Sequence, residues 1–404
     1  MQTKLADFIR ATPEGEEAES ILRACVHCGF CTATCPTYQL LGDERDGPRG
    51  RIYLIKQVLE GGEVTRATQL HLDRCLSCRN CESTCPSGVR YGRLLDIGRK
   101  VVEDKVGRPA AQQALRTLLK ESLTRPWVFT PAVQAGRLLR PLLPRALRAK
   151  LMPAAAAGPR PQRAQARQML LLEGCVQPGL APNINAATAR VLDACGVQLI
   201  SPAQAGCCGA LRYHLNDQAG GLDDMRRNID AWTPYLDTVE AIVITASGCG
   251  LSVKEYGHLL AHDPAYAERA ARVSALARDV VEVLAEFTPL FAQRVAARGQ
   301  RVAYHPPCTL QHGQQIRGAV EGLLRAVGVE VALCADSHLC CGSAGTYALL
   351  QPQLSQQLRA RKLENLAATG AAEVVTANIG CISQLQGGAQ PVRHWIELLD
   401  ELLA

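Results

Sequence analysis

Two cysteine runs with identical spacing constrain this chain more than any other feature. The runs are Cys25-x2-Cys28-x2-Cys31-x3-Cys35-Pro36 and Cys75-x2-Cys78-x2-Cys81-x3-Cys85-Pro86. Three thiolates at positions i, i+3 and i+6 can wrap one iron–sulfur cubane from a tight loop, and the cysteine before proline reaches across to the other cubane. The pattern therefore predicts two [4Fe–4S] clusters.

The crossing pattern assigns four ligands to each cluster. Cluster 1 takes Cys25, Cys28, Cys31 and Cys85. Cluster 2 takes Cys75, Cys78, Cys81 and Cys35. Proline after each crossing ligand removes a backbone donor and turns the chain. Such a pair moves single electrons, so we predict an electron-transfer protein with no catalytic residue in this chain.

Zinc and disulfides explain these runs less well. Structural zinc needs four cysteines, usually as two separated pairs, and the two runs exceed that requirement. No charged and then apolar leader precedes the first run, so we expect a cytoplasmic protein. In a reducing compartment, 18 cysteines indicate metal ligands rather than disulfide bridges.

The residues around the runs have helical periodicity. A helix is expected over 51–60, where apolar residues recur at helical spacing before Gly61-Gly62. A second helix is expected over 94–106. We therefore predict a helical dicluster ferredoxin domain over 1–104.

Length and composition bound the rest of the architecture. A chain of 404 residues with 47% apolar residues predicts two or three globular domains. No stretch approaches the roughly 18 to 20 apolar residues of a membrane span, so membrane attachment would be peripheral or through a partner.

A basic, proline-rich linker with short helices is predicted over 105–166. Lys105 to Gln168 contains 13 Lys or Arg and one acid, Glu121, whereas the whole chain has a net charge of +6. Such a segment can lie on an anionic lipid surface or an acidic subunit, or it can be a solvated connector, and both interpretations stay open. Nucleic acid is not expected as a partner, because only 4% of residues are aromatic and no binding fold accompanies the charge.

The second half of the chain is an internal repeat. One cysteine set contains Cys175, Cys207, Cys208 and Cys249, and the other contains Cys308, Cys340, Cys341 and Cys381. The shift between equivalent cysteines is 133 residues at three positions and 132 at the fourth. A near-constant shift indicates duplication. We predict one cysteine-rich domain over 167–297 and another over 298–404.

Each repeat alternates predicted strands and helices. Strands are expected over 168–175, 241–249, 301–308 and 373–381, each ending at a cysteine, and helices over 186–194 and 318–327. The Cys-Cys-Gly segments at 206–209 and 339–342 are predicted to be loops. Strand–helix alternation predicts two α/β units with parallel sheets, and ligands bind at the carboxyl ends of such strands. The overall class is therefore α+β multidomain, with a helical ferredoxin domain before two α/β repeats.

Three roles compete for the repeated cysteine sets. Four converging thiols suit an additional iron–sulfur cluster or zinc. They also suit a dithiol that shuttles electrons through a disulfide. Small buried core residues are the third interpretation, which repetition of the whole constellation disfavours. Cys195 and Cys334 lie outside the repeat pattern and are interpreted as core residues.

Histidines near the cysteines are interpreted as structural. His27 lies inside the first cysteine run, and His305, His312 and His338 lie near the second repeat's cysteines. A lone histidine near a strand end is more often a hydrogen-bonded structural residue than a ligand or a base.

The paired Cys-Cys-Gly loops resemble the cysteine-rich domain of heterodisulfide reductases. The domain order resembles the iron–sulfur subunits of bacterial glycolate oxidase, anaerobic glycerol-3-phosphate dehydrogenase and lactate-utilisation complexes, with the glycolate oxidase family most similar. The segments that carry this resemblance start at Cys25, Asp46, Asp336 and Val392, and read CVHCGFCTATCPTY, DGPRGRIYLIKQ, DSHLCCGSAGTY and VRHWIE.

The resemblance implies a complex with two flavin-binding (FAD-family) partner subunits. Such a complex oxidises glycolate to glyoxylate, with D-lactate as a secondary substrate, and passes electrons to the membrane quinone pool. The implied location is cytoplasmic and peripheral to the inner membrane. The chain has no Gly-x-Gly-x-x-Gly after a strand, so the flavin belongs to a partner.

One departure from the resemblance concerns the last cysteine of each set. Heterodisulfide reductases have a Cys-x-x-Cys pair there, whereas this chain has Ser252 and Gln384 at the second position. Five-thiolate clusters are therefore not expected. A catalytic disulfide or quinone reductase at the Cys-Cys-Gly sites, and the equivalent subunit of a glycerol-3-phosphate or lactate dehydrogenase, stay as alternatives.

Overall fold

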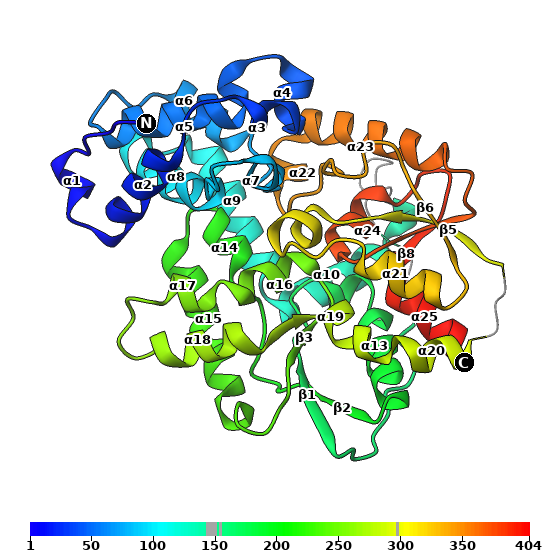
Figure 1. Ribbon diagram of the computed structural model, residues 1–404. Coiled ribbons are helices and arrows are strands. Elements are labelled where there is room, and N and C mark those ends of the chain that lie inside the picture. The colour runs from blue at the N-terminus through cyan, green and yellow to red at the C-terminus, as the bar shows by residue number, and fades with distance from the viewer. Residues whose placement is uncertain (143–151, 153–155, 296–298) are drawn as a thin grey trace. The chain divides into compact units, whose positions relative to one another are not determined.

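The computed structural model describes residues 1–142, 152, 156–295 and 299–404 (Figure 1). These residues form two compact units. The first contains Met1–Thr117 and His338–Ala360, and the second contains Leu118–Ser337 and Arg361–Ala404. The combination of a helical unit with parallel sheets confirms the predicted α+β class.

The first unit is built from helices. They are α1 (Asp7–Arg10), α2 (Pro13–Ala24), α3 (Phe30–Ala33), α4 (Pro36–Leu41), α5 (Pro48–Leu59), α6 (Arg66–Asp73), α7 (Asn80–Thr84), α8 (Tyr91–Val106) and α22 (Tyr347–Leu350), with the 3-10 turn η1 (Glu44–Asp46). Helices α9 (Ala110–Leu123) and α23 (Pro352–Ala367) each have residues in both units. The helices predicted over 51–60 and 94–106 are confirmed as α5 and α8.

Local sequence explains where these helices begin and how they pack. The Thr12 side chain accepts a hydrogen bond from Gly15 N and Pro13 occupies the first turn of α2, which is a favourable helix start. Leu22, Ile55 and Leu94 are fully buried in the core of this unit. The helices therefore pack around one apolar core and leave the cysteine loops at its edge.

The second unit contains two four-stranded parallel sheets. Their strands are β1 (Arg167–Leu171), β2 (Val197–Ile200), β3 (Ile242–Ile244), β4 (Ala277–Asp279), β5 (Arg301–His305), β6 (Glu330–Leu333), β7 (Glu373–Thr376) and β8 (Val392–His394). The strand orders are β2-β1-β3-β4 and β6-β5-β7-β8. The two sheets thus have the same topology, as expected for a duplicated domain, and each reverses strand order beside its first strand.

Helices cover these sheets (Figure 1). They are α10 (Pro126–Leu138), α12 (Gln177–Leu180), α13 (Asn183–Ala194), α14 (Ala210–His214), α15 (Gln218–Trp232), α16 (Ser247–Lys254), α17 (Tyr256–Leu259), α18 (Ala267–Leu276), α19 (Val280–Leu284), α20 (Thr288–Arg294), α21 (Ala319–Ala326), α24 (Ile379–Leu385) and α25 (Trp395–Leu403). Alternate residues of β1 and β3 pack against α15 and α18, where Trp232 and Val273 are fully buried. This alternation is the ordinary side-chain period of a strand.

The two repeats contact each other through α13 and α25. Arg190 Nη2 lies 2.6 Å from Asp400 Oδ2, and Asn183 Nδ2 donates to Glu397 Oε1 at 3.0 Å. In addition, the His394 ring contacts Thr245 O through Nε2 at 2.9 Å. Polar contacts from both repeats therefore fix one sheet relative to the other.

All four predicted strands were too long, because none of them reaches its cysteine. The strands over 168–175 and 301–308 end at Leu171 and His305. Those over 241–249 and 373–381 end at Ile244 and Thr376, and Cys249 and Cys381 lie in the first turns of α16 and α24. β3 and β7 contain only three and four residues, and the helix that leads to the next strand begins a few residues after each of them. The apolar run alone could not mark that change from strand to helix.

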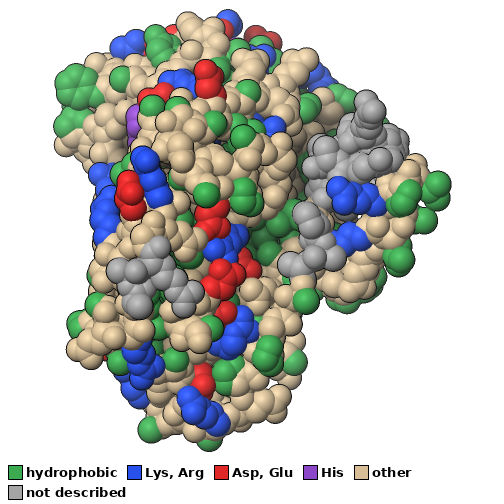
Figure 2. All heavy atoms as spheres, turned by 90° about the vertical axis from the view of Figure 1, so that its right-hand side faces the viewer, with side chains coloured by type: hydrophobic (Ala, Val, Ile, Leu, Met, Phe, Trp, Pro, Cys, Tyr) green, Lys and Arg blue, Asp and Glu red, His purple; other side chains and the backbone are tan. Residues whose placement is uncertain are grey.

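The basic segment forms helices between Ala110 and Leu142, has no helix or strand over 156–166, and is largely ion-paired where it is described. Its helices α9 and α10 are longer than the predicted short helices, with 14 and 13 residues. Arg108 pairs with Asp73 at 2.6 Å, Lys120 with Asp217 at 2.9 Å, and Arg167 with Glu240 at 2.6 Å. Figure 2 shows basic and acidic side chains side by side on the face it presents. Part of the predicted linker, 143–151 and 153–155, lies outside the described residues.

Among the helices of the described residues, none combines the length and the apolar character needed to cross a membrane.

Candidate metal centres

Two neighbouring cavities in the first unit are each surrounded by cysteines. The lining of the first cavity includes Cys25, Cys28, Cys31 and Cys85. The lining of the second includes Cys35, Cys75, Cys78 and Cys81. Cys81 borders both cavities. Each predicted ligand set, including its crossing cysteine, therefore gathers around one cavity.

The backbone of the two cysteine loops explains how the thiols turn inward. In the first loop His27 and Gly29 have positive φ angles of 60° and 86°. In the second loop Ser77 and Arg79, at the equivalent positions, have 53° and 57°. Left-handed residues at the same two positions coil each loop tightly. The coil turns the three cysteine side chains of the loop toward one centre.

The chemistry of these donor sets fits a cationic cluster core. Burial, with the neighbouring Cys25 next in importance, raises the pKa of Cys31 to about 11. Burial and the neighbouring Cys78 raise the pKa of Cys81 well above its usual value. Four thiolates so close together repel each other and lose hydration, and positive metal ions at the centre would compensate for both effects.

Second-sphere donors gather mainly around the second cavity. Tyr91 Oη donates to Cys75 Sγ at 3.6 Å, and Ser77 N donates to the same sulfur at 3.4 Å. Thr37 Oγ1 lies 3.3 Å from Cys35 Sγ. Hydrogen bonds to ligand sulfurs raise the reduction potential of a cluster, so the two sites differ in their electronic environment.

Arg51 places a buried positive charge beside the second cavity. Its guanidinium donates to His71 O at 2.7 Å and to Thr37 Oγ1 at 3.1 Å, and it lies 3.4 Å from Asp46. Burial lowers the pKa of Arg51, but Cys75 and other nearby anionic groups outweigh burial and raise it above its usual value. Arg51, Tyr91 and Thr37 were not predicted as site residues from the sequence. Only the DGPRGR motif at Asp46, which contains Arg51, pointed toward it.

The Cys-Cys-Gly loop of the second repeat belongs to the same unit as the two cavities. Asn80 Nδ2, in α7, donates to His338 O at 3.2 Å. Tyr347 Oη donates to Arg74 O at 3.1 Å. Burial and then the nearby Cys75 raise the pKa of Tyr347. The segment containing Cys340 and Cys341 is thus tied to the loops of the second cavity.

The four cysteines of the first repeat form a chain of neighbouring thiols. Cys207 acts on the pKa of Cys175, Cys208 acts on that of Cys207, and Cys249 acts on that of Cys208, so consecutive thiols of this chain lie close together. The neighbouring Cys207 thiol, followed by burial, raises the pKa of Cys175 well above its usual value. These residues follow β1, β2 and β3, at the carboxyl ends where the strand order reverses. They form a compact donor set that suits a thiophilic metal.

Buried polar groups hold the Cys-Cys-Gly loop of the first repeat in place. Tyr256 Oη and Ser252 Oγ donate to Cys208 O at 2.9 and 3.1 Å, and Asn228 Nδ2 donates to Cys207 O at 2.8 Å. Gly209 has a φ of 83°, and a Cβ there would lie 2.5 Å from Gly221 O. Glycine at this position therefore satisfies both a left-handed turn and a close approach of two backbones.

The cysteines of the second repeat are divided between the two compact units. Cys340 and Cys341 belong to the first unit, and Cys308 and Cys381 belong to the second. Of the two cysteines outside the repeat, Cys334 is buried as predicted, whereas Cys195 is only partly buried. Cys195 lies at the C-terminal end of α13, where the helix leaves the core.

The histidines interpreted as structural differ in their surroundings. The His27 ring lies 6.3 Å from the Tyr53 ring, at the first cavity. His305 is buried at the end of β5, and neither ring nitrogen has a hydrogen-bond partner among the described residues. The prediction of a hydrogen-bonded side chain was therefore wrong for His305, because burial at the strand end separates its ring from solvent and no donor or acceptor of the described residues reaches it.

A helical unit with two cysteine-lined cavities, in one chain with a duplicated parallel-sheet domain and its Cys-Cys-Gly loops, defines an iron–sulfur protein of the dicluster class. Two family models match accordingly. The 4Fe-4S dicluster domain matches residues 21–89, and the cysteine-rich domain matches residues 169–254 and 302–386.

Full-length relatives then give the family. The chain is 57% identical over 408 residues to the "Glycolate oxidase iron-sulfur subunit" of Escherichia coli K12, covering 100% of this chain and 99% of that protein. It is 30% identical to the "Probable glycolate oxidase iron-sulfur subunit" of Bacillus subtilis, covering 95% of this chain and 91% of the relative. The chain belongs to the family of glycolate oxidase iron–sulfur subunits.

A solved structure shares the fold at much lower sequence identity. A hypothetical protein from Helicobacter pylori aligns with a TM-score of 0.51 and 11% identity, covering 98% of this chain and 73% of that one. This likeness concerns the fold alone.

Proposed function

We propose that this chain is the electron-transfer subunit of a flavin-dependent glycolate oxidase complex. The observation that carries the proposal is the pair of neighbouring cavities, each lined by the four cysteines that the crossing pattern assigns to one [4Fe–4S] cluster. Such clusters supply one-electron transfer and no substrate chemistry. The names of the full-length relatives support glycolate as the substrate of the complex.

In this proposal the chain works with two flavin-binding subunits. They oxidise glycolate to glyoxylate, with D-lactate as a secondary substrate, and the two clusters relay the electrons toward membrane quinone. The complex would be cytoplasmic and would associate peripherally with the inner membrane.

We also propose that the Cys-Cys-Gly sets hold an additional iron–sulfur cluster or zinc. The thiol chain of the first repeat supports this proposal, because its four cysteines act on one another's pKa values and therefore lie close together. The sets are Cys175, Cys207, Cys208 and Cys249, and Cys308, Cys340, Cys341 and Cys381. The domain boundaries at 104/105, 166/167 and 297/298 also stay proposals.

Anaerobic purification with the flavin subunits tests the proposal. The wild-type complex should reduce an artificial dye with glycolate, and the chain should contain at least eight irons and eight labile sulfides. Cys31→Ser should lower the iron content and the rate of dye reduction through the clusters. Cys195→Ser, which changes a cysteine outside both patterns, is the matched control and should change neither. Colourless wild-type chain without iron would refute the proposal.

The thiol chain of the first repeat also favours a second candidate, a catalytic dithiol that reduces a disulfide or a quinone. Cys208→Ser separates the two. An electron relay with intact cubanes should continue to reduce the dye. A catalytic dithiol should lose its activity while the electron paramagnetic resonance (EPR) signal of the cubanes survives.

A further inference from the structure

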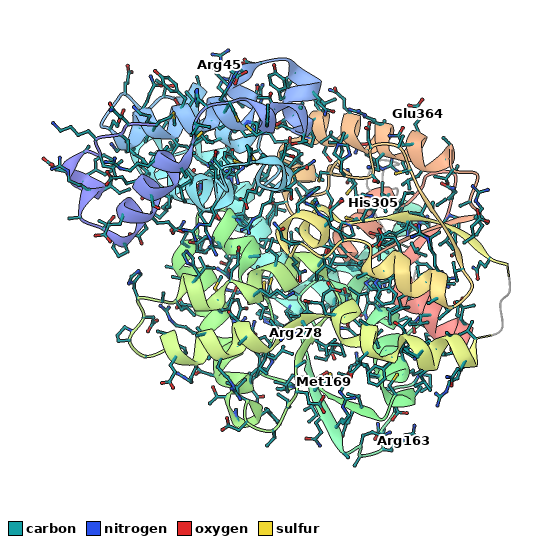
Figure 3. The ribbon with its side chains drawn as sticks, in the orientation of Figure 1. Arg45, Arg163, Met169, Arg278, His305 and Glu364 are labelled. Atoms are coloured by element: carbon teal, nitrogen blue, oxygen red, sulfur yellow. The ribbon has the colours of Figure 1, made fainter. Side chains whose placement is uncertain are left out.

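His305 is a buried imidazole whose ring has no partner. It is the last residue of β5, its exposed fraction is 1%, and both ring nitrogens lack hydrogen-bond partners among the described residues (labelled in Figure 3). Its backbone, by contrast, is satisfied, because Thr376 Oγ1 donates to His305 O at 2.8 Å. A buried polar group without a protein partner is uncommon in folded proteins, and such a group can instead bind an ion.

Cys381 is a metal-ligating residue of the same unit that lies close to the His305 ring. A ring nitrogen of His305 and Sγ of Cys381 lie within 4.8 Å of each other. Cys381 is 3% exposed and lies in the first turn of α24, directly after the strand that pairs with β5. Two atoms that bind a common metal ion at about 2.0 to 2.3 Å lie within this distance of each other.

The equivalent position in the first repeat is apolar. The shift of 133 residues places His305 opposite Leu172, which is 2% exposed and packs in the core of its repeat. An aliphatic side chain therefore suits this place in the fold when packing is the only requirement. Packing alone does not account for the imidazole in the second repeat.

His305 and Cys381 come from neighbouring strands of one sheet. β5 ends at His305, and β7, which pairs with β5, is followed by the first turn of α24 that contains Cys381. Mixed cysteine and histidine ligation is common both for zinc and for some iron–sulfur centres.

We propose that His305 is a ligand of a thiophilic metal centre in the second repeat, together with Cys381 of the same unit. This inference rests on the proposed metal sites of the Cys-Cys-Gly sets and adds a nitrogen donor to one of them. A neutral imidazole donates one lone pair to the metal and releases no proton. The two N-terminal clusters have thiolate ligands only, so histidine ligation distinguishes the new centre.

Spectroscopy of the full chain, isolated anaerobically with its partner subunits, tests this assignment. Histidine is labelled with ¹⁵N, and the metal content is determined first. For an iron–sulfur centre, pulsed EPR of the reduced protein should show a coupling that changes from ¹⁴N to ¹⁵N on labelling. For zinc, X-ray absorption should show a nitrogen shell near about 2.0 Å beside the sulfur shell.

Two variants and a matched control accompany the labelling. His305→Leu introduces the residue of the first repeat and should remove one metal centre per chain while the N-terminal clusters stay loaded. His305→Cys supplies a thiolate and should retain the metal but lose the nitrogen signal. His394→Leu changes an equally buried histidine of the same repeat whose ring nitrogens both have partners, and should leave the metal content unchanged.

The outcomes distinguish a failure of the proposed His305 ligand from a failure of the proposed metal sites in the Cys-Cys-Gly sets. Metal present in the second repeat without a histidine signal, or retained unchanged in His305→Leu, overturns the role of His305 alone. No metal beyond the two N-terminal clusters overturns both the inference and the additional sites. Neither result would affect the two N-terminal clusters or the proposed electron relay.

Discussion

Asp279 gives the sharpest quantitative prediction, because it is an acid buried at the junction of the two repeats. It ends β4 and caps α19, with its side chain accepting from Val281 N at 3.2 Å. Burial raises its pKa from 3.8 to about 7, while the hydrogen bond from Val281 N opposes this shift. Glu282, Lys254 and Gln314 also act on it more weakly.

The sign of the pH effect follows from proton binding. Between pH of about 4 and 7 the folded chain keeps the Asp279 proton that the unfolded chain has released. The stability of the fold must therefore fall as the pH rises through this window and level off above it. At about 1.4 kcal/mol per pKa unit, the full effect is about 4 kcal/mol, of which about 3 kcal/mol falls between pH 5 and 8.

The test compares wild type with Asp279→Asn at each pH. Asparagine also caps helices but does not titrate, so the stability difference between the two proteins isolates this one proton. Urea denaturation can be followed by the fluorescence of Trp232 and Trp395, both fully buried in the second unit. Asp237→Asn, at a side chain that is 99% exposed, is the control.

We expect wild type to lose about 3 kcal/mol relative to Asp279→Asn between pH 5 and 8. The Asp237→Asn difference should stay constant within a few tenths of a kcal/mol. A difference between wild type and Asp279→Asn that is independent of pH would refute the reasoning, because it would show that the buried carboxyl titrates as it does in water.

Three further predictions concern other sites. Burial lowers the pKa of His394 to about 4, so the folded protein binds fewer protons than the unfolded chain between pH 4 and 6.5. The unfolding free energy of wild type should therefore rise by up to about 3 kcal/mol relative to His394→Asn over this range. A difference in urea denaturation that does not change with pH would contradict this prediction. Arg51→Met should shift the reduction potential of one cluster by on the order of 50 mV to a more negative value in an EPR redox titration. Arg45→Met, at an exposed arginine, should shift the potential of neither cluster. Equal shifts in the two variants would argue against the role of the buried charge. Gly209→Ala should lower the unfolding free energy by on the order of 2 kcal/mol or more, measured by thermal denaturation. Gly322→Ala, where a Cβ meets open space, should be neutral or stabilising by up to about 1 kcal/mol. Similar values for both variants would contradict the close approach of the two backbones at Gly209.

The position of Asp279 has a counterpart in the other repeat. Asp279 and His394 both end the last strand of their sheet and both cap the helix that follows with a capping box. One is an acid with a raised pKa and the other a base with a lowered pKa, so burial keeps both neutral. Their effects on stability oppose each other between pH of about 4 and 6.5, which is why single variants are needed to see either one.

The fold was predictable where periodicity and repetition were strong. The helices at 51–60 and 94–106 and the parallel sheets of both repeats follow from apolar spacing and from the constant shift between cysteine sets. The ends of β3 and β7 were not predictable, because an apolar run continues from a buried strand into a buried helix without a change of composition.

The sequence by itself predicted which cysteines gather around each cavity, because three of each set lie in one loop of seven residues and the spacing pattern adds the crossing cysteine from the other run. Only the tertiary structure placed Arg51, Tyr91 and Thr37 around the second cavity, and only it left the His305 imidazole unpartnered beside Cys381. These contacts join residues that are far apart in the chain or lie on neighbouring strands. The packing of the core brings them together, and no spacing along the chain encodes that packing.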